Sequence, residues 1–401
     1  MTHIAERTTR IETSASSVAT QKARALRAEG HDIISLTQGQ PDFPTPDNVK
    51  QAAIAAMERD ETAYTPVGGT PALKDAIAEK FRRENGLEYS HDQIIASNGG
   101  KQVIYNAIMS SVEPGDEVVV VAPYWVSYPE MTKFAEGIPV IHECKEENDF
   151  KVTPQELETL LTDKARWLAL NSPNNPTGAV YSADDYRALG DVLMNYPNCM
   201  LMSDDIYEHI LFDGAEFASP AAADPRLFER TLTVNGVSKA YAMTGWRMGY
   251  AGGPEPLIKT MHKLQNQSTG NPCSITQAAV IEALSGPQDI LAERSAAFQE
   301  RRDLMLDRLN NCPGLSCIKP GGAFYVYPSC AGVIGKKTTS GKVIETDQDF
   351  VIYLMEEHGV AAVHGAAYGL SPHFRLSFAA STEELEEACR RIQGACQALS
   401  G

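Results

Sequence analysis

Short apolar runs alternate with longer amphipathic stretches through the middle of the chain. The apolar runs lie at 94–96, 118–121, 167–170, 200–202, 232–234 and 248–250. Apolar residues at helical spacing separate many of them, over 101–112, 182–196 and 273–284. Several runs are apolar throughout instead of alternating with polar residues, which is typical of strands that helices cover on both faces. The pattern therefore predicts an α/β fold with a mostly parallel sheet covered by helices.

The two ends of the chain have a different texture. Alanine and leucine at helical spacing after a Ser/Thr-rich start predict a helix over 14–29, followed by a short strand at 33–36. We therefore expect a large domain over 38–287 and a smaller α+β domain formed by 1–37 and 288–401. Beyond about residue 285, we expect a charged helix over 288–310, a strand pair around 322–327, a mobile hydrophilic loop over 332–349, a strand at 374–378 and a helix over 381–398.

Composition limits the classes of partner. The 401 residues carry 35 Lys and Arg against 52 Asp and Glu, a net charge of −17. This argues against a nucleic-acid partner, because phosphate backbones require a cationic surface. No apolar stretch reaches the roughly 20 residues that cross a bilayer, and the chain starts without a secretory pattern, so we expect a cytoplasmic protein with no membrane partner. The eight cysteines form no CxxC pair, so we expect reduced thiols and no metal.

Two motifs with turn-forming residues follow predicted strands, where open α/β sheets gather their ligands. The first, Ser-Asn-Gly-Gly-Lys-Gln at 97–102, could cradle a phosphate between its glycines and the helix start, although Gly-Gly is often only a turn. The second, Asn-Ser-Pro-Asn-Asn-Pro-Thr-Gly at 171–178, contains two prolines that make a rigid loop. That loop could orient an asparagine toward the sheet edge or be a surface turn.

Two further motifs contribute charged groups. Asp204 follows a buried strand and could pair with a protonated ring nitrogen, which Tyr207 could also touch, whereas Asp205 could equally cap a helix. Lys239 lies among apolar and small residues, which lower the pKa of an amine and suit Schiff-base chemistry; a solvated surface lysine is the common alternative. Arg247 opens the next strand with glycines nearby and could form a fork to a phosphate.

The order of these motifs resembles that of the class I aminotransferases of fold type I. The resemblance rests on Asn-Pro-Thr-Gly at 175–178, Asp-x-x-Tyr at 204–207, and Ser-Lys at 238–239 followed by Gly-Trp-Arg-x-Gly at 245–249. It extends over nearly the whole chain, from Gly-x-Pro-Asp-Phe at 39–43 to Phe-Arg-Leu-Ser at 374–377. The segments 13–16, 99–102 and 123–129 are most similar to those of bacterial-type aspartate aminotransferases. Some members of that sub-branch also use prephenate.

The resemblance implies a pyridoxal 5′-phosphate cofactor and a catalytic role for several residues. Lys239 would hold the cofactor as a Schiff base and shuttle the proton. Asp204 would keep the pyridinium nitrogen protonated, which strengthens the ring as an electron sink. Tyr207 and Asn175 would hydrogen-bond the phenolic oxygen, and Trp125 would stack on the ring.

The resemblance also implies how the phosphate is held. Arg247 and the backbone of Gly99 and Gly100, with Lys101 following them, would form the phosphate site. Tyr64 would reach that site from a partner subunit, which implies a homodimer. Many relatives have a serine three residues before the lysine, where this chain has Gly236, so one hydroxyl is expected to be lost from the phosphate site.

The substrate site is implied in the same way. Arg375 would clamp the α-carboxylate, and Lys101 would meet the side-chain carboxylate of a dicarboxylic amino acid. These residues would assist at the substrate site: Gly39, Trp125, Asn175, Ser14 and Ser16. Another pyridoxal-phosphate reaction, such as β-elimination or transamination of aromatic or alanine-like substrates, stays open, because the sequence does not show the pocket. A ligand-sensing regulator is disfavoured, because the cofactor motifs begin too near the N-terminus to leave room for an attached DNA-binding domain. An inert relative is disfavoured, because the set of cofactor and substrate residues is complete.

Overall fold

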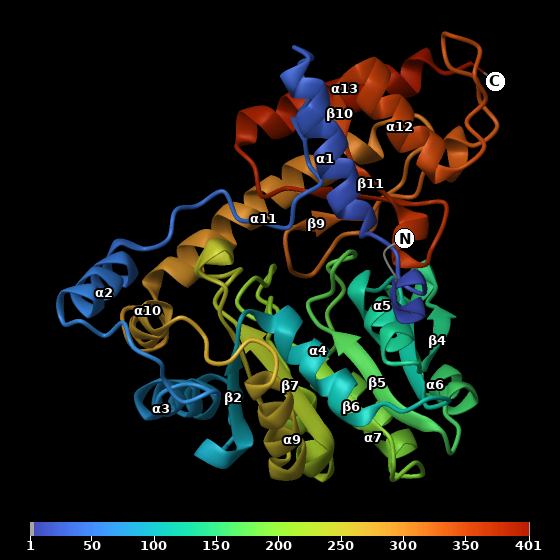
Figure 1. The fold of residues 1–401 in the computed structure, drawn as a ribbon. Helices are drawn as coiled ribbons and strands as arrows, with labels where there is room; N and C mark the ends of the chain where they lie inside the picture. The colour runs from blue at the N-terminus through green and yellow to red at the C-terminus, as the bar shows by residue number, and fades with distance from the viewer. Residues whose placement is uncertain (1–3, 401) are drawn as a thin grey trace.

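A seven-stranded sheet forms the centre of the computed structural model, which describes residues 4–400 (Figure 1). Its strand order is β2-β8-β7-β6-β5-β3-β4, and only β8 runs antiparallel to its neighbours β7 and β2. The predicted mostly parallel sheet is therefore confirmed. The strands are β2 (Ile94–Ser97), β3 (Glu117–Ala122), β4 (Ile138–Glu143), β5 (Ala165–Asn171), β6 (Met200–Asp204), β7 (Thr231–Gly236) and β8 (Gly249–Gly252).

Helices cover both faces of this sheet (Figure 1). The side chains of β3 alternate between the two layers of helices. Val118 and Val120 pack toward α4 (Gly100–Ser111), α5 (Ser127–Phe134) and α9 (Glu255–Asn266). Val119 and Val121 pack toward α6 (Pro154–Leu160) and α7 (Ala183–Leu193) on the opposite face. This double cover is the physical reason that the predicted strands are apolar throughout.

One strand of the sheet was missed by the sequence analysis. β4 pairs only with β3, at the edge of the sheet, and its side chains are partly or largely exposed. It contains Pro139 and His142, so it lacks the continuous apolar pattern of the interior strands. At the opposite edge of the sheet, α3 (Pro71–Lys80) packs against β2, and α10 (Ser274–Ser285) packs against both α3 and α2 (Asp47–Glu58). The short α8 (Pro220–Ala223) lies beside α7 and β7.

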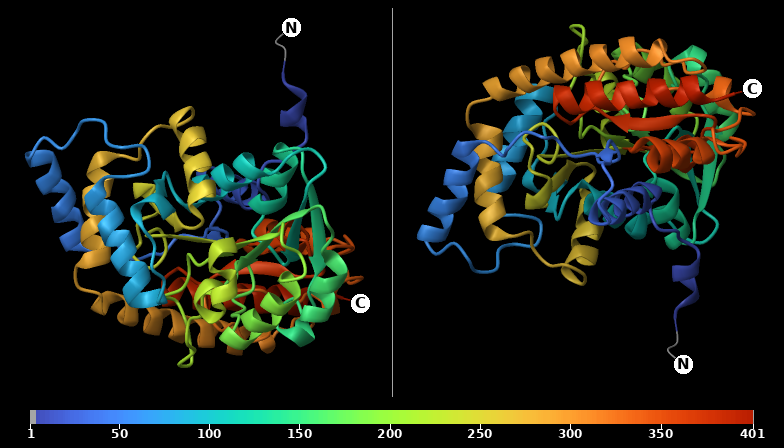
Figure 2. Two further views of the ribbon diagram at one scale, coloured as in Figure 1. Left: turned by 90° about the horizontal axis from the view of Figure 1, so that it is seen from below. Right: turned by 90° about the horizontal axis from the view of Figure 1, so that it is seen from above.

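The two chain ends combine around two small sheets. β1 (Ile34–Ser35) pairs in parallel with β10 (Val360–Ala361), and β12 (Phe374–Ser377) lies between β11 (Val363–His364) and β9 (Tyr325–Val326). The long helix α11 (Asp289–Asn310) runs beside α13 (Thr382–Ala398) (Figure 2). α1 (Ala15–Ala28) and α12 (Asp347–His358) complete this part. The domain boundaries at 38 and 287 stay a prediction.

Two predictions for the second half of the chain were wrong in part. The pair of strands around 322–327 is a single short strand, β9, whose partner is the distant β12, because Gly322 forms only an isolated bridge with Leu211. The stretch 332–349 is a loop only in part, and its mobility stays a prediction. Ile344 is buried, and the Lys337 N–H donates to the Ser400 carbonyl at 2.7 Å. The last three residues of the stretch belong to α12, whose start is capped by Thr346.

In the part of the chain that the structure describes, no helix is both long and apolar enough to cross a membrane.

Several polar side chains in the interior are paired with one another. Lys80, at the end of α3, is fully buried and binds the Glu208 carboxylate and the Asn85 side-chain oxygen, the latter at 2.8 Å. Asn235 donates to Glu208 at 2.8 Å and accepts from the Gly236 N–H at 2.7 Å. The network therefore ties α3 to the carboxyl ends of β6 and β7.

The charge of this network is balanced by the lysine. Burial acts to raise the pKa of Glu208, but Lys80 and His209 outweigh it and hold that pKa below its ordinary value. Glu84, Glu208 and His209 bring ligand atoms within 4.8 Å of one another, the spacing of a metal site. The Lys80 ammonium binds Glu208 and lies 3.5 Å from Glu84, and the Arg83 guanidinium also binds Glu84, so both carboxylates have a cationic side chain beside them.

Replacing Lys80 with methionine would leave the Glu208 carboxylate buried without its counter-charge. Loss of one partner of a buried pair costs about 3–5 kcal/mol, so we expect the free energy of unfolding in a urea titration to fall by that amount. Arg82→Met is the matched control, because Arg82 and Glu79 form an exposed pair (60% and 48%), worth at most about 1 kcal/mol. Equal losses in the two variants would contradict the importance of the buried pair.

Candidate active site

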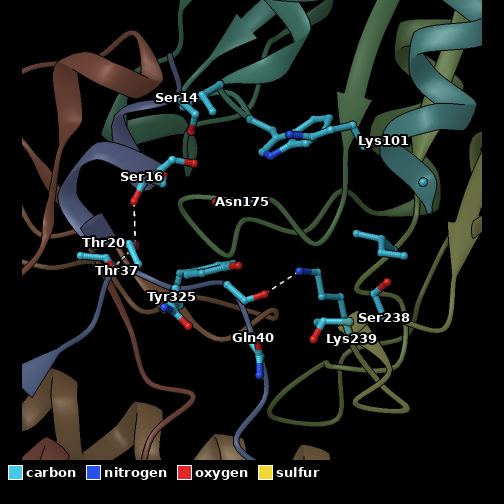
Figure 3. A pocket seen from close by; sticks show the side chains of 18 of the residues that line it. Ser14, Ser16, Thr20, Thr37, Gln40, Lys101, Asn175, Ser238, Lys239 and Tyr325 are labelled. Atoms are coloured by element: carbon cyan, nitrogen blue, oxygen red, sulfur yellow. Dashed lines mark hydrogen bonds between the residues drawn. The ribbon is translucent and has the colours of Figure 1, made fainter. Parts of the chain in front are cut away.

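A cleft of about 530 Å³ lies where the carboxyl ends of the strands meet α1 and the small sheet (Figure 3). Asn171 and Asp204, which end β5 and β6, line the cleft from the seven-stranded sheet, and Arg375 of β12 lines it from the small sheet. Every residue predicted for the site lines the cleft except Gly99 and Tyr64. Those that line it are Ser14, Ser16, Gly39, Gly100, Lys101, Trp125, Asn175, Asp204, Tyr207, Lys239, Arg247 and Arg375.

Lys239 lies in the loop after β7 and points into the cleft (Figure 3). Its Nζ donates to the Gly39 carbonyl at 2.6 Å and lies 5.6 Å from the centre of the Tyr207 ring. Burial, reinforced by the positive charge of Arg375, lowers the pKa of Lys239 from 10.5 to about 8. The neutral amine, which is the form that attacks a carbonyl, is therefore far more abundant near neutral pH than for an ordinary lysine.

Asp204 presents a buried carboxylate to the same cleft. The Tyr128 hydroxyl donates to its Oδ2 at 2.7 Å, and the Asn171 amide donates to its backbone oxygen at 2.7 Å, which fixes the strand end. Burial raises the pKa of Asp204 to about 6, although Tyr128, the Ile206 N–H and Lys239 all act to lower it. A protonated ring nitrogen beside this carboxylate would favour its charged form.

The neighbouring carboxyl, Asp205, has no such access to the cleft. It is fully buried, and its Oδ1 accepts a hydrogen bond from the Ser203 hydroxyl at 2.5 Å. Its backbone N–H donates to Val234 of β7 at 2.9 Å, so the chain is still paired with the sheet at this point. The suggestion that Asp205 caps a helix was therefore wrong, because no helix begins there.

Arg375 is held rigidly in the wall of the cleft. Its two terminal nitrogens donate to the Asn175 side-chain oxygen, at 2.9 Å, and to the Thr37 carbonyl. The guanidinium carbon lies 4.5 Å from the centre of the Tyr325 ring and 5.1 Å from that of Tyr368. Its Nε is buried and has no partner among the residues that the structure describes. Arg375 can therefore offer hydrogen bonds and an undiminished positive charge to an anion.

Glycines bring the start of α4 close to the Arg247 guanidinium. A Cβ atom at Gly99, whose φ is +92°, would lie 2.5 Å from an Arg247 nitrogen. A Cβ atom at Gly249 would lie 2.1 Å from the Gly100 nitrogen. Arg247 itself has a left-handed φ of 52°, a strained conformation that clusters at functional sites. Ser238 lines the cleft nearby, so this corner combines backbone N–H groups, a guanidinium and a hydroxyl, as a phosphate requires.

The glycine that replaces a common serine, Gly236, has a structural reason. A Cβ atom there would lie 3.0 Å from the Met248 carbonyl oxygen and 3.1 Å from the Gly249 Cα. β7 and β8 pair at this point, with Gly236 opposite Gly249. A side chain at position 236 would therefore require its neighbours to shift by a few tenths of an ångström, at the end of the two strands whose connection carries Lys239 and Arg247.

Lys101 and the two predicted serines lie on facing walls of the cleft (Figure 3). The Lys101 Nζ lies 5.0 Å from the centre of the Trp125 ring, in a cation–π contact. Ser16 shares a hydrogen bond of 3.2 Å with the Tyr368 hydroxyl, and Ser14 precedes α1. Partial burial, followed by the charge of Arg247, lowers the pKa of Lys101. An anionic group that enters between these walls would favour the charged form of Lys101.

The cleft is strongly cationic although the protein as a whole is acidic. Asp204 is its only carboxylate among the lining residues. Such a concentration of positive charge draws in and retains anionic ligands. The cationic side chains that line it are Arg24, Lys101, Lys239, Arg247 and Arg375.

Two site tyrosines were not predicted. Tyr128, which binds Asp204, lies in the 123–129 motif one helical turn after Trp125, so that motif held a usable signal. Tyr325 reaches the cleft from β9, and its hydroxyl lies 2.7 Å from that of Tyr207. No sequence signal joins Tyr325 to a residue 118 positions away, because the contact arises from strand pairing in the small sheet.

Tyr64 lies outside the cleft of its own chain. Its side chain is 99% exposed, an unusual state for a tyrosine. The segment that follows it is nevertheless fixed: the Gln277 amide donates to the Thr65 hydroxyl at 2.8 Å, and the Gln265 amide donates to the Val67 carbonyl at 2.7 Å. The protein therefore presents Tyr64 to its surroundings from an anchored segment.

Comparison with known proteins gives a consistent result. The family described as aminotransferase class I and II matches residues 31–392. The chain is 53% identical over 398 residues to a probable aspartate/prephenate aminotransferase of Rhizobium leguminosarum bv. phaseoli, covering 99% of this chain and 100% of the relative. It is 52% identical over 400 residues to the aspartate/prephenate aminotransferase of Cereibacter sphaeroides, covering 100% of both.

Solved structures agree. The aspartate aminotransferase from Rhizobium meliloti has a TM-score of 0.97 and 52% identity, with 100% of both chains covered. The aspartate aminotransferase from Thermus thermophilus with maleate has a TM-score of 0.91 and 41% identity, covering 98% of this chain and 100% of that one.

The lowered pKa of Lys239 makes a prediction about its reactivity. We expect cofactor-free protein to be labelled by pyridoxal phosphate and borohydride at a rate that rises with pH around a midpoint of about 8, because only the neutral amine reacts. The labelling rate is measured by mass spectrometry, with Lys239→Ala as the control that loses the adduct. A midpoint near the ordinary 10.5, or an undiminished adduct in Lys239→Ala, would contradict the assignment.

Proposed function

The chain belongs to the class I and II aminotransferase family, and we propose from its own geometry how it carries out that reaction. It is an aspartate-type aminotransferase that depends on pyridoxal 5′-phosphate. We propose aspartate and glutamate as amino donors, and 2-oxoglutarate and oxaloacetate as acceptors. The observation that carries the proposal is the meeting of a partly buried amine, a buried carboxylate and a buried guanidinium in one cleft, from Lys239, Asp204 and Arg375.

Pyridoxal phosphate supplies an electron sink for the charge that develops at the substrate α-carbon. In this proposal, Lys239 holds the cofactor covalently and then, as a free amine, moves the proton at the α-carbon. Asp204 pairs with the ring nitrogen, and its hydrogen bond from Tyr128 keeps the carboxylate oriented. Tyr207 and Asn175 hydrogen-bond the phenolic oxygen.

The remaining cofactor contacts are proposed on the same footing. Trp125 stacks on the ring, and Arg247 binds the phosphate with the backbone of Gly99 and Gly100. Ser238 is added to this group because it lines the cleft beside Lys239. Two observations support this part of the proposal. Gly99 lets the Arg247 guanidinium come close to the start of α4. A bound phosphate dianion would also reduce the repulsion among the cationic side chains of the cleft.

The substrate is proposed to bind by its carboxylates. Arg375 meets the α-carboxylate, assisted by Asn175 and the backbone of Gly39. Lys101 meets the side-chain carboxylate across the cleft from Ser14 and Ser16. A second carboxylate requires such a partner, because its desolvation is otherwise uncompensated.

Prephenate is proposed as a further amino acceptor. Two of the relatives carry aspartate/prephenate aminotransferase as their name, at 52% and 53% identity over almost the whole chain. We also propose a cytoplasmic location, which fits an enzyme of amino-acid metabolism.

A homodimer with shared active sites completes the proposal. Tyr64 is fully exposed on an anchored segment and is proposed to reach the cofactor phosphate of the partner subunit. The single chain supplies every other proposed phosphate contact from its own cleft or from the Gly99 turn beside it.

Lys101→Ala tests the substrate assignment. Loss of a charge-assisted hydrogen bond costs about 1.5–3 kcal/mol, so we expect kcat/KM for aspartate to fall by roughly 10- to 100-fold. Alanine as donor is the control and should change little, because it has no second carboxylate. Steady-state rates with both donors and with 2-oxoglutarate decide the point. Equal losses for the two donors would assign Lys101 to the cofactor or the fold, and a wild-type preference for alanine or phenylalanine would remove the aspartate assignment.

Subunit mixing tests the shared active site. Tyr64→Phe and Lys239→Ala subunits are each expected to have low activity as homodimers. After exchange, one of the two sites in each hybrid would carry both an intact Lys239 and an intact partner Tyr64, so part of the activity should return. Activity is measured before and after exchange, which is confirmed by mass spectrometry of tagged subunits. Absence of recovery after complete exchange would show that each site is built from one chain.

A further inference from the structure

One buried side chain of the cleft has no role in the proposed reaction, although it touches two residues that do. Tyr325 lies on β9, is fully buried as a residue, and lines the cleft near Lys239 (Figure 3). We propose that Tyr325 is a positioning residue that couples the carboxylate-binding Arg375 to the cofactor-binding Tyr207. This inference rests on the proposed roles of Arg375 and Tyr207.

The hydroxyl of Tyr325 is directed to Tyr207. The two hydroxyl oxygens lie 2.7 Å apart. The Tyr325 oxygen is also pressed against the backbone of Gly39, because a Cβ atom at Gly39 would lie only 2.2 Å from it. The adjacent Gly39 carbonyl already accepts from Lys239. The surroundings therefore leave Tyr207 as the natural partner of the Tyr325 hydroxyl.

The direction of this hydrogen bond follows from the proposed role of Tyr207. The two hydroxyl groups share one hydrogen bond, and each of them has a single proton to donate. In the proposed reaction the Tyr207 proton points at the cofactor's phenolic oxygen, so the Tyr207 oxygen is left to accept from the Tyr325 hydroxyl. Tyr325 thereby fixes the orientation of the Tyr207 hydroxyl.

The ring of the same side chain supports Arg375. The guanidinium carbon lies 4.5 Å from the centre of the Tyr325 ring and 5.1 Å from the centre of the Tyr368 ring, so Tyr325 is the nearer of the two. Pairing of β9 with β12 places Tyr325 opposite Ser377, two residues beyond Arg375 and on the same face of the strand. One rigid side chain thus contacts both sites, with its face on Arg375 and its hydroxyl on Tyr207.

Tyr325→Phe isolates the hydroxyl, since it keeps the ring over Arg375. A donor to the phenolic oxygen stabilises the anionic form of that oxygen, so a poorly oriented Tyr207 makes the cofactor keep its proton to higher pH. We expect the pH midpoint of the visible absorption band of the cofactor-loaded enzyme to rise by about 0.4–1 unit, the effect of one hydrogen bond. Tyr368→Phe, which loses only its bond to Ser16, is the matched control and should leave the midpoint unchanged.

A double-mutant cycle separates this inference from the proposed function. Tyr207→Phe alone should raise the midpoint, and adding Tyr325→Phe to it should cause no further change, because Tyr325 acts through Tyr207. If Tyr207→Phe leaves the midpoint unmoved, the proposed role of Tyr207 is wrong. If Tyr207→Phe raises it but Tyr325→Phe does not, or if the two shifts add, the positioning role of Tyr325 is overturned.

A second variant tests the ring. Tyr325→Leu removes the aromatic ring from Arg375. In a spectral titration with maleate, an unreactive dicarboxylate, we therefore expect a dissociation constant about 2- to 30-fold higher than in Tyr325→Phe. Near-UV circular dichroism of the loaded enzyme reports whether the core tolerates leucine. Equal maleate affinity in the leucine and phenylalanine variants would overturn the support of Arg375 by the ring, and the phenylalanine titration tests the hydroxyl independently of it.

Discussion

The active site depends on one buried carboxylate among several cations. Asp204 is the single acidic side chain in the cleft lining, and it shares that space with Lys239, Arg247 and Arg375. Burial is the largest cause that raises the pKa of Asp204 to about 6 and lowers that of Lys239 to about 8, so it weakens the charged form of each group. A cofactor that brings a protonated ring nitrogen and a phosphate supplies the opposite charge that each of these groups lacks. The same groups that destabilise the isolated cleft therefore select the ligand.

The fold meets this electrostatic demand by bringing chain segments together from four directions. β5 and β6 end in the cleft, the β7–β8 connection carries Lys239 and Arg247, and β12 supplies Arg375 from the small sheet. α1 closes the remaining side. Behind the strand ends, the buried pair of Lys80 and Glu208 fixes the turns after β6 and β7 through Asn235. The position of the catalytic groups is thus set by interactions that never touch the substrate.

The sequence predicted those parts of this arrangement that depend on short, local patterns of residues. Apolar runs identified the interior strands, because both faces of the sheet are covered, and motifs at strand ends identified Asp204, Lys239 and Arg247. It missed β4, whose edge position leaves no apolar pattern, and α12, whose Thr346 cap lies in a hydrophilic stretch. Tyr325 could not be found, because its contact with Tyr207 depends on the long-range pairing of β9 with β12.

The charge balance at the end of β6 is tested most directly by Asp204→Asn. Asparagine has the same shape and can still accept from Tyr128, so the fold and cofactor binding should persist, as judged by the visible absorption band. A neutral amide cannot hold the ring nitrogen protonated, and loss of a preorganised electrostatic partner of this kind lowers turnover by about 100-fold or more. We therefore expect kcat with aspartate and 2-oxoglutarate to fall by at least that factor in the fully loaded variant. Wild-type turnover in cofactor-loaded Asp204→Asn would contradict the account.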